Sequence, residues 1–398
     1  LSFKSDFTHY ARPGYKSKFG LEAQGYFIDP GSFSLDTTFA ILPDIKPNYS
    51  RKLALYYEGE WDINSRLRLK AGVRMLNWAN RGPATYYLFD NQYQVRDTIE
   101  TAAAIYNDYS NFDPRLSLRY QLDSSALLKL SFGVYHQYLQ LISNSVSPFS
   151  SFEVWLPAGP NIRPQSSMHW ALNYLKYFEK TGFEFSSSVY YKKFNHQIDY
   201  KDHPVILLNP LLEGELRFGF MHAYGIEFLL KKDLGRLNGW MGYTYSRAIR
   251  KTPDLNGGRT YPAFQDRPHD FSMMINYRFA SQLHFSAYYT IYSGSTFSSP
   301  TGFYTFNSQT VPIYEEKNND RLPTYQRFDF ALKLLLNKRE DARFQHSLTF
   351  SIYNALSHKN IVTVDFNRIP REGERPVVKA NVLNETALTA TQSDLIRF

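Results

Sequence analysis

Apolar and polar side chains alternate residue by residue along many segments of this 398-residue chain. In one such segment Phe183, Phe185 and Val189 alternate with Glu184 and Ser188. Successive side chains of a β-strand point to opposite faces, so a period of two predicts strands with one apolar and one polar face. The alternation is clearest in the segments 67–75, 183–192, 271–279, 283–291 and 327–334.

Two classes of protein share this alternation. In a soluble β-sandwich or propeller the apolar face packs into a core, whereas in a transmembrane barrel it faces lipid and the polar face lines the lumen. Aromatic residues, with 31 Tyr, 31 Phe and 5 Trp, make up 17% of the sequence. Aromatic belts at the membrane interfaces explain such enrichment physically. Composition and alternation alone leave both classes open.

Segment length and connection length favour the membrane barrel. Many segments exceed the roughly 5–6 residues of an average soluble strand and reach the roughly 9–11 that a tilted membrane-crossing strand needs. Short connections, near 13–14, 63–65, 123–125, 179–182, 233–236, 280–282 and 337–343, alternate with long ones near 29–50, 80–110, 140–163, 201–215, 251–263, 295–321 and 369–387. Short periplasmic turns and long extracellular loops are typical of outer-membrane barrels.

The pattern predicts an all-β, antiparallel transmembrane barrel with about 15 strands in this chain. They fall near 1–12, 15–28, 51–63, 66–79, 112–122, 126–139, 164–178, 183–200, 216–232, 236–250, 264–279, 283–294, 322–336, 343–366 and 388–398. Single-chain bacterial barrels have an even strand number, so we expect a partial barrel, and roughly seven upstream strands would make 22. No segment approaches the roughly 18 apolar residues of a membrane-spanning helix.

The charged residues give a formal net charge of +8, but they are scattered rather than gathered into one basic stripe. This distribution argues against a nucleic-acid partner and is compatible with anionic outer-membrane lipid, including lipopolysaccharide. Charges are costly toward lipid, so we expect them on the lumen face. The expected inward charges are Arg74, Arg115, Arg119, Lys129, Glu184, Lys192, Glu227, Arg278, Arg327, Asp329 and Lys333.

Seven segments, in order, resemble TonB-dependent outer-membrane receptors of the Bacteroidetes type. They are LALYYEGEWDINSRLRLKAGVR (53–74), DPRLSLRYQL (113–122), PNIRPQSSMHWALNY (160–174), AYGIEFLLKK (223–232), GWMGYTYSRA (239–248), QDRPHDFSMMINYRF (265–279) and SLTFSIYNALSHKN (347–360). The resemblance implies that residues 1–398 are the C-terminal part of the barrel. The plug domain, the TonB box and the first strands would lie upstream, and the last strand would be truncated at Phe398.

The resemblance also implies a function and partners. It implies a receptor in the outer membrane for active import of a scarce, large solute such as a siderophore, a cobalamin-like chelate, a glycan or a peptide. The TonB–ExbB–ExbD system would act through the upstream region, and a surface lipoprotein is a further candidate partner. The alternative is a receptor-like barrel that serves as a structural or interaction subunit of an outer-membrane complex.

The sequence contains no recognisable catalytic motif, and we expect no enzyme activity and no cofactor. It has no HExxH pair, no cysteine and no glycine-rich phosphate loop. His196 and His203 enclose Asp199 and Asp202 on one long loop, which permits a metal-chelate site. Ordinary solvated loop polarity is the favoured interpretation, so no metal site is predicted.

Five residues are candidates for ligand binding. Trp155, Tyr86, Tyr87 and Tyr261 lie in loops and would form an aromatic platform for a sugar ring or a flat chelate, because aromatic faces offer a large contact area. Packing within the loops or the interfacial belt is the favoured alternative. Arg267 is the fifth candidate, although ion pairing at the rim, together with its neighbours Asp266 and His269, is again the favoured role.

Overall fold

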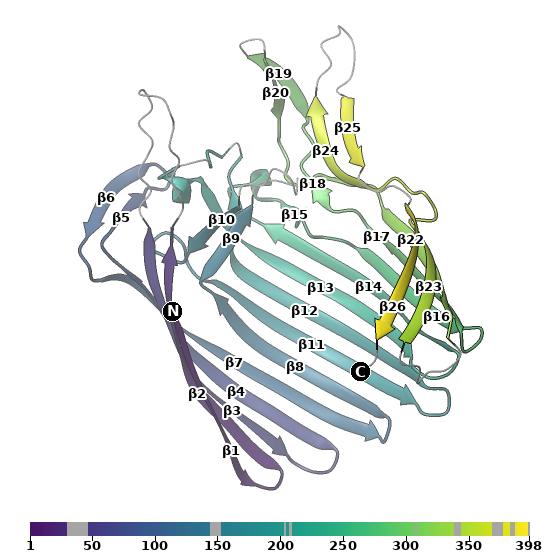
Figure 1. The fold of residues 1–398 in the computed structure, drawn as a ribbon. Coiled ribbons are helices and arrows are strands. Elements are labelled where there is room, and N and C mark those ends of the chain that lie inside the picture. The colour runs from purple at the N-terminus through teal and green to yellow at the C-terminus, as the bar shows by residue number, and fades with distance from the viewer. Residues whose placement is uncertain are drawn as a thin grey trace.

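One large antiparallel sheet dominates the computed structural model (Figure 1), which describes residues 1–29, 47–143, 153–202, 204–206, 209–306, 309–337, 344–367, 377–382 and 387–396. Fifteen of its 16 strands form a continuous path, and β15 (Thr260–Pro262) pairs only with β14. The path consists of β1 (Ser2–Arg12), β2 (Tyr15–Ile28), β3 (Asn48–Asp62), β4 (Leu67–Arg81), β7 (Ile105–Asp123), β8 (Ala126–Gln137), β11 (Gln165–Phe178), β12 (Phe183–Tyr200), β13 (Leu216–Lys232), β14 (Leu237–Lys251), β16 (His269–Arg278), β17 (Leu283–Tyr292), β22 (Tyr325–Leu335), β23 (Phe344–Tyr353) and β26 (Ala387–Ile396).

The strands follow one another in chain order, so the predicted count of about 15 wall strands is confirmed. Short turns join them at one end of the sheet, and long connections that carry small hairpins lie at the other end (Figure 1). The small paired strands are β5 (Ala84–Phe89) with β6 (Val95–Thr101), β9 (Leu139–Ser143) with β10 (Glu153–Pro157), β18 (Thr296–Phe297) with β21 (Asp320–Arg321), β19 (Gly302–Phe306) with β20 (Gln309–Ile313), and β24 (Ile361–Asn367) with β25 (Val377–Val382). This asymmetry agrees with the predicted turns and loops.

Three predicted segments have other bounds than expected. The strand predicted near 112–122 begins at Ile105, within the long connection predicted near 80–110. The segment 264–279 begins as strand β16 only at His269, because Pro268 has no backbone N–H to donate to the ladder. The prediction of a single strand over 343–366 is wrong. Strand β23 stops at Tyr353, and the chain turns at Asn354 and Ser357, whose φ angles are 49° and 50°.

Helical structure in the described residues is limited to two short 3₁₀ turns, η1 (Leu212–Glu215) and η2 (Asn256–Gly258). None of the described helices has the length and apolar character needed to cross a membrane. The sheet is therefore the only element of the described chain that is large enough to organise the molecule.

The strand register aligns apolar side chains in rows. Leu118 lies opposite Leu130, Leu130 opposite Leu172, Leu172 opposite Val189, and Val189 opposite Ile226. Leu130, Leu172 and Val189 are about half exposed, at 50%, 48% and 50%. None of the described residues covers these side chains, so the apolar row needs a lipid environment to remove it from water. Below, this surface is called the lipid face.

The opposite face of the sheet, here called the lumen face, carries ion pairs across the first four strands. Glu22 on β2 contacts Lys52 on β3 at 3.2 Å and Arg74 on β4 at 2.6 Å. Glu58 on β3 lies 2.8 Å from Lys70 on β4. Partly exposed pairs of this kind contribute only about 0–1 kcal/mol each. These charged side chains lie on the face away from lipid, as predicted for Arg74.

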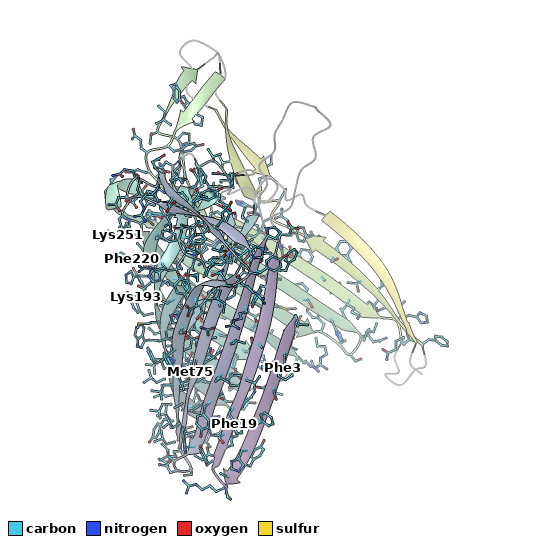
Figure 2. The ribbon with its side chains drawn as sticks, turned by 90° about the vertical axis from the view of Figure 1, so that its left-hand side faces the viewer. Phe3, Phe19, Met75, Lys193, Phe220 and Lys251 are labelled. Carbon is cyan, nitrogen blue, oxygen red and sulfur yellow. The ribbon has the colours of Figure 1, made fainter. Side chains whose placement is uncertain are left out.

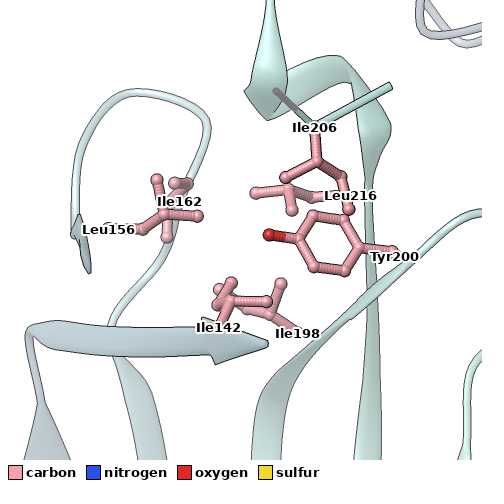
Figure 3. Packing of buried hydrophobic residues seen from close by; sticks show 7 residues of the cluster. All are labelled: Ile142, Leu156, Ile162, Ile198, Tyr200, Ile206 and Leu216. Carbon is pink, nitrogen blue, oxygen red and sulfur yellow. The ribbon is translucent and has the colours of Figure 1, made fainter. Parts of the chain in front are cut away.

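A hydrophobic cluster joins the long connections to the ends of the strands. Figure 3 shows its buried residues, which come from β9 and β10, from the ends of β12 and β13, and from the segments between the strands. They are Ile142, Leu156, Ile162, Ile198, Tyr200, Ile206 and Leu216. Because buried apolar contacts fix loop conformation, this cluster holds the described parts of these connections on the wall.

The two faces predict opposite responses to a charge placed near the middle of β12. We expect Val189→Lys, on the lipid face, to lower the free energy of unfolding in lipid by about 2–4 kcal/mol, the cost of a lysine near the bilayer midplane. Denaturant unfolding in liposomes measures this. The matched control, Ser188→Lys, puts the same charge on the lumen face opposite Glu227 and should cost less than about 1 kcal/mol. Equal losses for the two variants would contradict the assignment of the faces.

Candidate ligand-binding site

A pocket of about 330 Å³ opens on the lumen face between β2 and the residues that follow β8. Its aromatic wall is a stack: Trp78 lies 5.4 Å from Tyr138 with ring planes only 8° apart, and 5.3 Å from Tyr26. The Trp78 indole N–H donates to the carbonyl oxygen of Ala158 at 3.0 Å, and the side chain is 1% exposed. Tyr138 is likewise only 4% exposed, so the stack is a rigid, buried support beneath the pocket, fixed by the wall strands.

Positive charge surrounds this stack. Lys52 and Arg74 line the pocket and share one carboxylate, Glu22. Arg115 lies over the Tyr135 ring at 4.8 Å, and within the described residues it forms no ion pair. The remaining acid, Asp113, is 3% exposed and lies 2.6 Å from the His136 ring nitrogen. Cations outnumber free carboxylates, so the pocket favours an anionic group.

The polar end of the stack contains an unpaired group. The Tyr138 hydroxyl is buried and has no hydrogen-bond partner among the described residues. A second pocket, of about 190 Å³, adjoins the first through their shared residues Arg74, Asp113 and Arg115. The two pockets together give the lumen face of β1–β8 a continuous polar and aromatic surface.

Above the wall, a buried carboxylate ties three connections together. Asp199, near the end of β12, accepts hydrogen bonds from Lys317 at 2.7 Å, from Arg250 at 3.2 Å and from the Tyr261 hydroxyl at 2.9 Å. Two cations and one hydroxyl satisfy this group in a partly buried site, where an unpaired carboxylate would be costly. The network fastens β15 and the segment before β21 to the end of β12.

A second loop carboxyl has a different environment. Glu213, in η1, accepts a hydrogen bond from the Asn161 side chain at 2.5 Å, and the same amide nitrogen donates to the Tyr87 carbonyl oxygen at 2.8 Å. Burial raises the pKa of Glu213 above its ordinary value of 4.5, an effect that the hydrogen bond from Asn161 opposes. Among the described residues it forms no ion pair, and the Asn161 amide is its hydrogen-bond donor.

The structure separates the predicted aromatic platform into individual positions. Tyr86 stacks on Tyr106 with ring centroids 5.3 Å apart, and Tyr87 uses its carbonyl oxygen to hold Asn161. Trp155 in β10 is 53% exposed, whereas Tyr261 is only 2% exposed. No ring contact joins Trp155 to the three tyrosines in the part of the chain that the structure describes. Ligand contact by these residues stays a prediction.

The favoured rim role is confirmed for Asp266. Its side chain is fully buried and pairs with Arg321 at 2.5 Å and with Arg247 at 3.3 Å. Arg267 instead lies 4.7 Å from the centre of the Tyr292 ring and donates to the Ser295 hydroxyl at 3.1 Å. Its role in ligand binding stays a prediction, because both contacts serve the packing of the rim.

The histidines named for a metal site do not form one in the described residues, where no group of three or more potential ligand side chains converges. The His196 ring nitrogen lies 3.0 Å from the Pro164 carbonyl oxygen, and Asp199 is occupied by two cations. His203 lies outside the described residues.

The alternation does not predict the aromatic stack, although the sequence contains one signal for it. Trp78 falls on the same phase of the alternation in β4 as Arg74, and so on the polar face. Leu76 shares this phase, so two large apolar side chains follow Arg74 on a face that is otherwise charged. The partner of Trp78, Tyr138, lies 60 residues away in the numbering, and only the register brings the two rings together.

Comparison with known proteins identifies the family. The family model "TonB dependent receptor-like, beta-barrel" matches residues 2–355. The chain belongs to this family. Its members are transport receptors, not enzymes, and its barrel lies in the outer membrane. No curated protein sequence matches the chain.

Solved receptor structures share the fold of this TonB-dependent receptor chain. It is similar to the ferric-catecholate import receptor Fiu from K12 E. coli in its closed form, with 11% identity, 99% of this chain and 54% of that chain covered, and a TM-score of 0.60. The ferripyoverdine receptor of Pseudomonas aeruginosa is 12% identical, with 99% of this chain and 48% of that chain covered and a TM-score of 0.60. The ferric yersiniabactin uptake receptor FyuA from Yersinia pestis is 12% identical, with 99% of this chain and 54% of that chain covered and a TM-score of 0.59.

The chain therefore spans about half the length of these receptors. At such low identity the likeness shows the shared fold and does not transfer a ligand. The Bacteroidetes type and the surface lipoprotein partner stay predictions.

The raised pKa of Glu213 predicts a pH-dependent loop. Above pH 4.5 the Glu213 carboxyl loses its proton when the segment is unfolded but retains it when the segment is folded. The folded loop therefore becomes less stable as pH rises, until the Glu213 carboxyl also ionises in the folded state. We expect amide hydrogen exchange of 209–217, corrected for intrinsic rates, to show less protection at pH 7 than at pH 4. Glu213→Gln should abolish the difference, whereas Glu179→Gln, at a short turn, should retain it. A pH-independent wild-type loop would contradict the prediction.

Proposed function

We propose that this chain forms the ligand-binding wall of an outer-membrane receptor that imports a scarce, large, anionic chelate in a TonB-dependent manner. The lumen-face pocket is the observation that carries the proposal. It brings Lys52, Arg74 and Arg115 together around one opening above the rigid Trp78 stack, which suits a ligand with several negative charges. Among siderophores, cobalamin-like chelates, glycans and peptides, this chemistry favours the ferric siderophore class.

The related receptors support the same class of ligand. Those named above are receptors for ferric-catecholate, ferripyoverdine and ferric yersiniabactin, all of them iron chelates. Neutral glycans would use aromatic stacking but would leave the excess of cations in the pocket unpaired, and unpaired charges in a partly buried site are costly. Energy for release into the periplasm would come from the TonB–ExbB–ExbD system.

We further propose that the chain is one part of a larger, 22-stranded wall around a plug domain. In the described residues β1 pairs only with β2, and its other edge has backbone groups without a strand partner. An open sheet edge is not tolerated in hydrocarbon, because each unsatisfied backbone group costs several kcal/mol. Additional strands of the same receptor would pair with this edge and close the barrel.

The test compares two arginines on the same strand and the same face. Arg115 lines the pocket, and Arg119 lies four residues further toward the short turns, outside it. In the full-length receptor we expect Arg115→Gln to weaken binding of the ferric siderophore that supports growth by about 10-fold to 100-fold, as loss of a charge-assisted hydrogen bond predicts. Arg119→Gln should change it less than about twofold.

Binding of ⁵⁵Fe-labelled chelates to cells and growth on single iron sources provide the readout. Uptake should require the TonB system, while surface binding should not. A receptor that binds and imports only neutral glycans or peptides, or one in which both arginine variants behave alike, would contradict the proposed ligand class. A barrel that imports nothing but copurifies with stoichiometric partners would instead identify a structural subunit.

A further inference from the structure

Basic side chains occupy the lipid face of β12, β13 and β14 near the long-connection end of the sheet. Lys193 has the same phase as Val189 on β12 and lies opposite His222 on β13. Lys251 on β14 lies opposite Phe220 on β13, and Arg247 lies opposite Tyr224. Figure 2 shows Lys193, Phe220 and Lys251 close together on the outer margin of the wall, just below the long connections. Lys193, His222, Arg247 and Lys251 are together called the basic patch below.

The position of the basic patch fits the depth of lipid headgroups. The register places Trp170, Tyr191 and Tyr224 side by side on β11, β12 and β13, directly beneath the patch. Tryptophan and tyrosine prefer the membrane interface, and charged side chains on a lipid face are tolerated there but not in hydrocarbon. The aromatic row therefore marks the interface. Arg247 lies in line with this row, opposite Tyr224, and Lys193 and Lys251 lie at its headgroup side.

Protein groups do not neutralise the patch. Lys193 and Lys251 form no ion pair within the part of the chain that the structure describes, and the former is exposed. Arg247 contacts Asp266, but that single carboxylate also pairs with Arg321. His222 has its ring nitrogen 2.5 Å from the Tyr191 hydroxyl, which orients the imidazole on the lipid face. The patch thus carries net positive charge that an external anion would balance.

Apolar contact area adjoins these cations. Phe220 packs edge-on against His222, with ring centroids 5.7 Å apart and an interplanar angle of 80°. Phe220, Tyr224 and Met168 on the same face are 36%, 43% and 38% exposed. Phe220 lies level with Lys251 and Met168 lies level with Lys193, whereas Tyr224 lies below both lysines. A ligand here would meet cations at its head and the aromatic row below, which is the polarity of a membrane lipid.

We propose that the basic patch binds the phosphate of an anionic, phosphorylated outer-leaflet lipid, with Trp170 and Tyr224 against its acyl chains. A water-soluble ligand would reach the lumen face or the loops, whereas this surface faces the bilayer. Lysine and arginine clusters at headgroup depth bind lipid phosphates electrostatically. The proposal rests on the outer-membrane location of the family and does not depend on import, so either can fail alone.

The test measures lipid binding by the purified protein in detergent micelles, using native mass spectrometry. The probes are diphosphorylated lipid A, the same lipid after removal of its phosphates, and inorganic phosphate alone. We expect Lys193→Gln/Lys251→Gln to bind diphosphorylated lipid A about 10-fold to 30-fold more weakly than wild type, as loss of two surface cations predicts. The dephosphorylated lipid should bind wild type as weakly as it binds this variant.

The matched control removes two lysines from the lumen face. Lys192 is adjacent to Lys193 but has the opposite phase, and Lys129 has the lumen phase on β8. Lys192→Gln/Lys129→Gln should retain wild-type lipid affinity. Lys193→Arg/Lys251→Arg should also retain it, because this variant keeps the positive charge of the patch, and it thereby separates loss of charge from an effect on folding. The proposal would be overturned if both glutamine variants bound the lipid with equal affinity, or if the two lipids bound wild type equally. It would also be overturned if micromolar inorganic phosphate alone displaced the lipid.

Discussion

The backbone ladder that runs through fifteen strands is the constraint on which the rest of the structure depends. In hydrocarbon every amide must find a protein partner, so the strands have to pair along their whole membrane-crossing length. Pairing fixes the register, and a shift by one residue would exchange the two faces. The row from Leu118 through Leu130, Leu172 and Val189 to Ile226 exists only in the observed register. The separation of lipid face from lumen face follows directly from the hydrogen bonds.

The functional surfaces are consequences of the same register. Trp78, Arg74 and Arg115 reach one pocket because their strands β4 and β7 are neighbours and their phases agree. Lys193 and Lys251 reach the bilayer because their phases are the opposite ones. A single rule, the alternation of side chains along paired strands, therefore places the proposed ligand pocket and the proposed lipid-binding patch on opposite faces. Above the wall, the partly buried Asp199 and the fully buried Asp266 join the long connections to one another through ion pairs.

Sequence alone predicted the wall well, because alternation and turn spacing are local signals that the ladder then enforces. All fifteen wall strands were located, including β12 at its observed bounds. The sequence did not predict the connections or the pocket, whose contacts join distant residues: Lys317 pairs with Asp199, 118 residues away. Nor did the break after β23 follow from alternation, because it depends on the left-handed conformation of Asn354. Tyr261 looked like a loop aromatic, and only the structure shows it to be buried.

The assignment of the two faces is tested most directly by a single-cysteine scan of residues 186–193 on β12, which the absence of native cysteine makes free of background labelling. Spin labels at each position in liposomes report access to oxygen, which partitions into lipid, and to a water-soluble nickel chelate. The account predicts that oxygen access peaks at 187, 189 and 191 and that nickel access peaks at 186, 188 and 190. The same access for neighbouring positions, or the reverse phase, would contradict it.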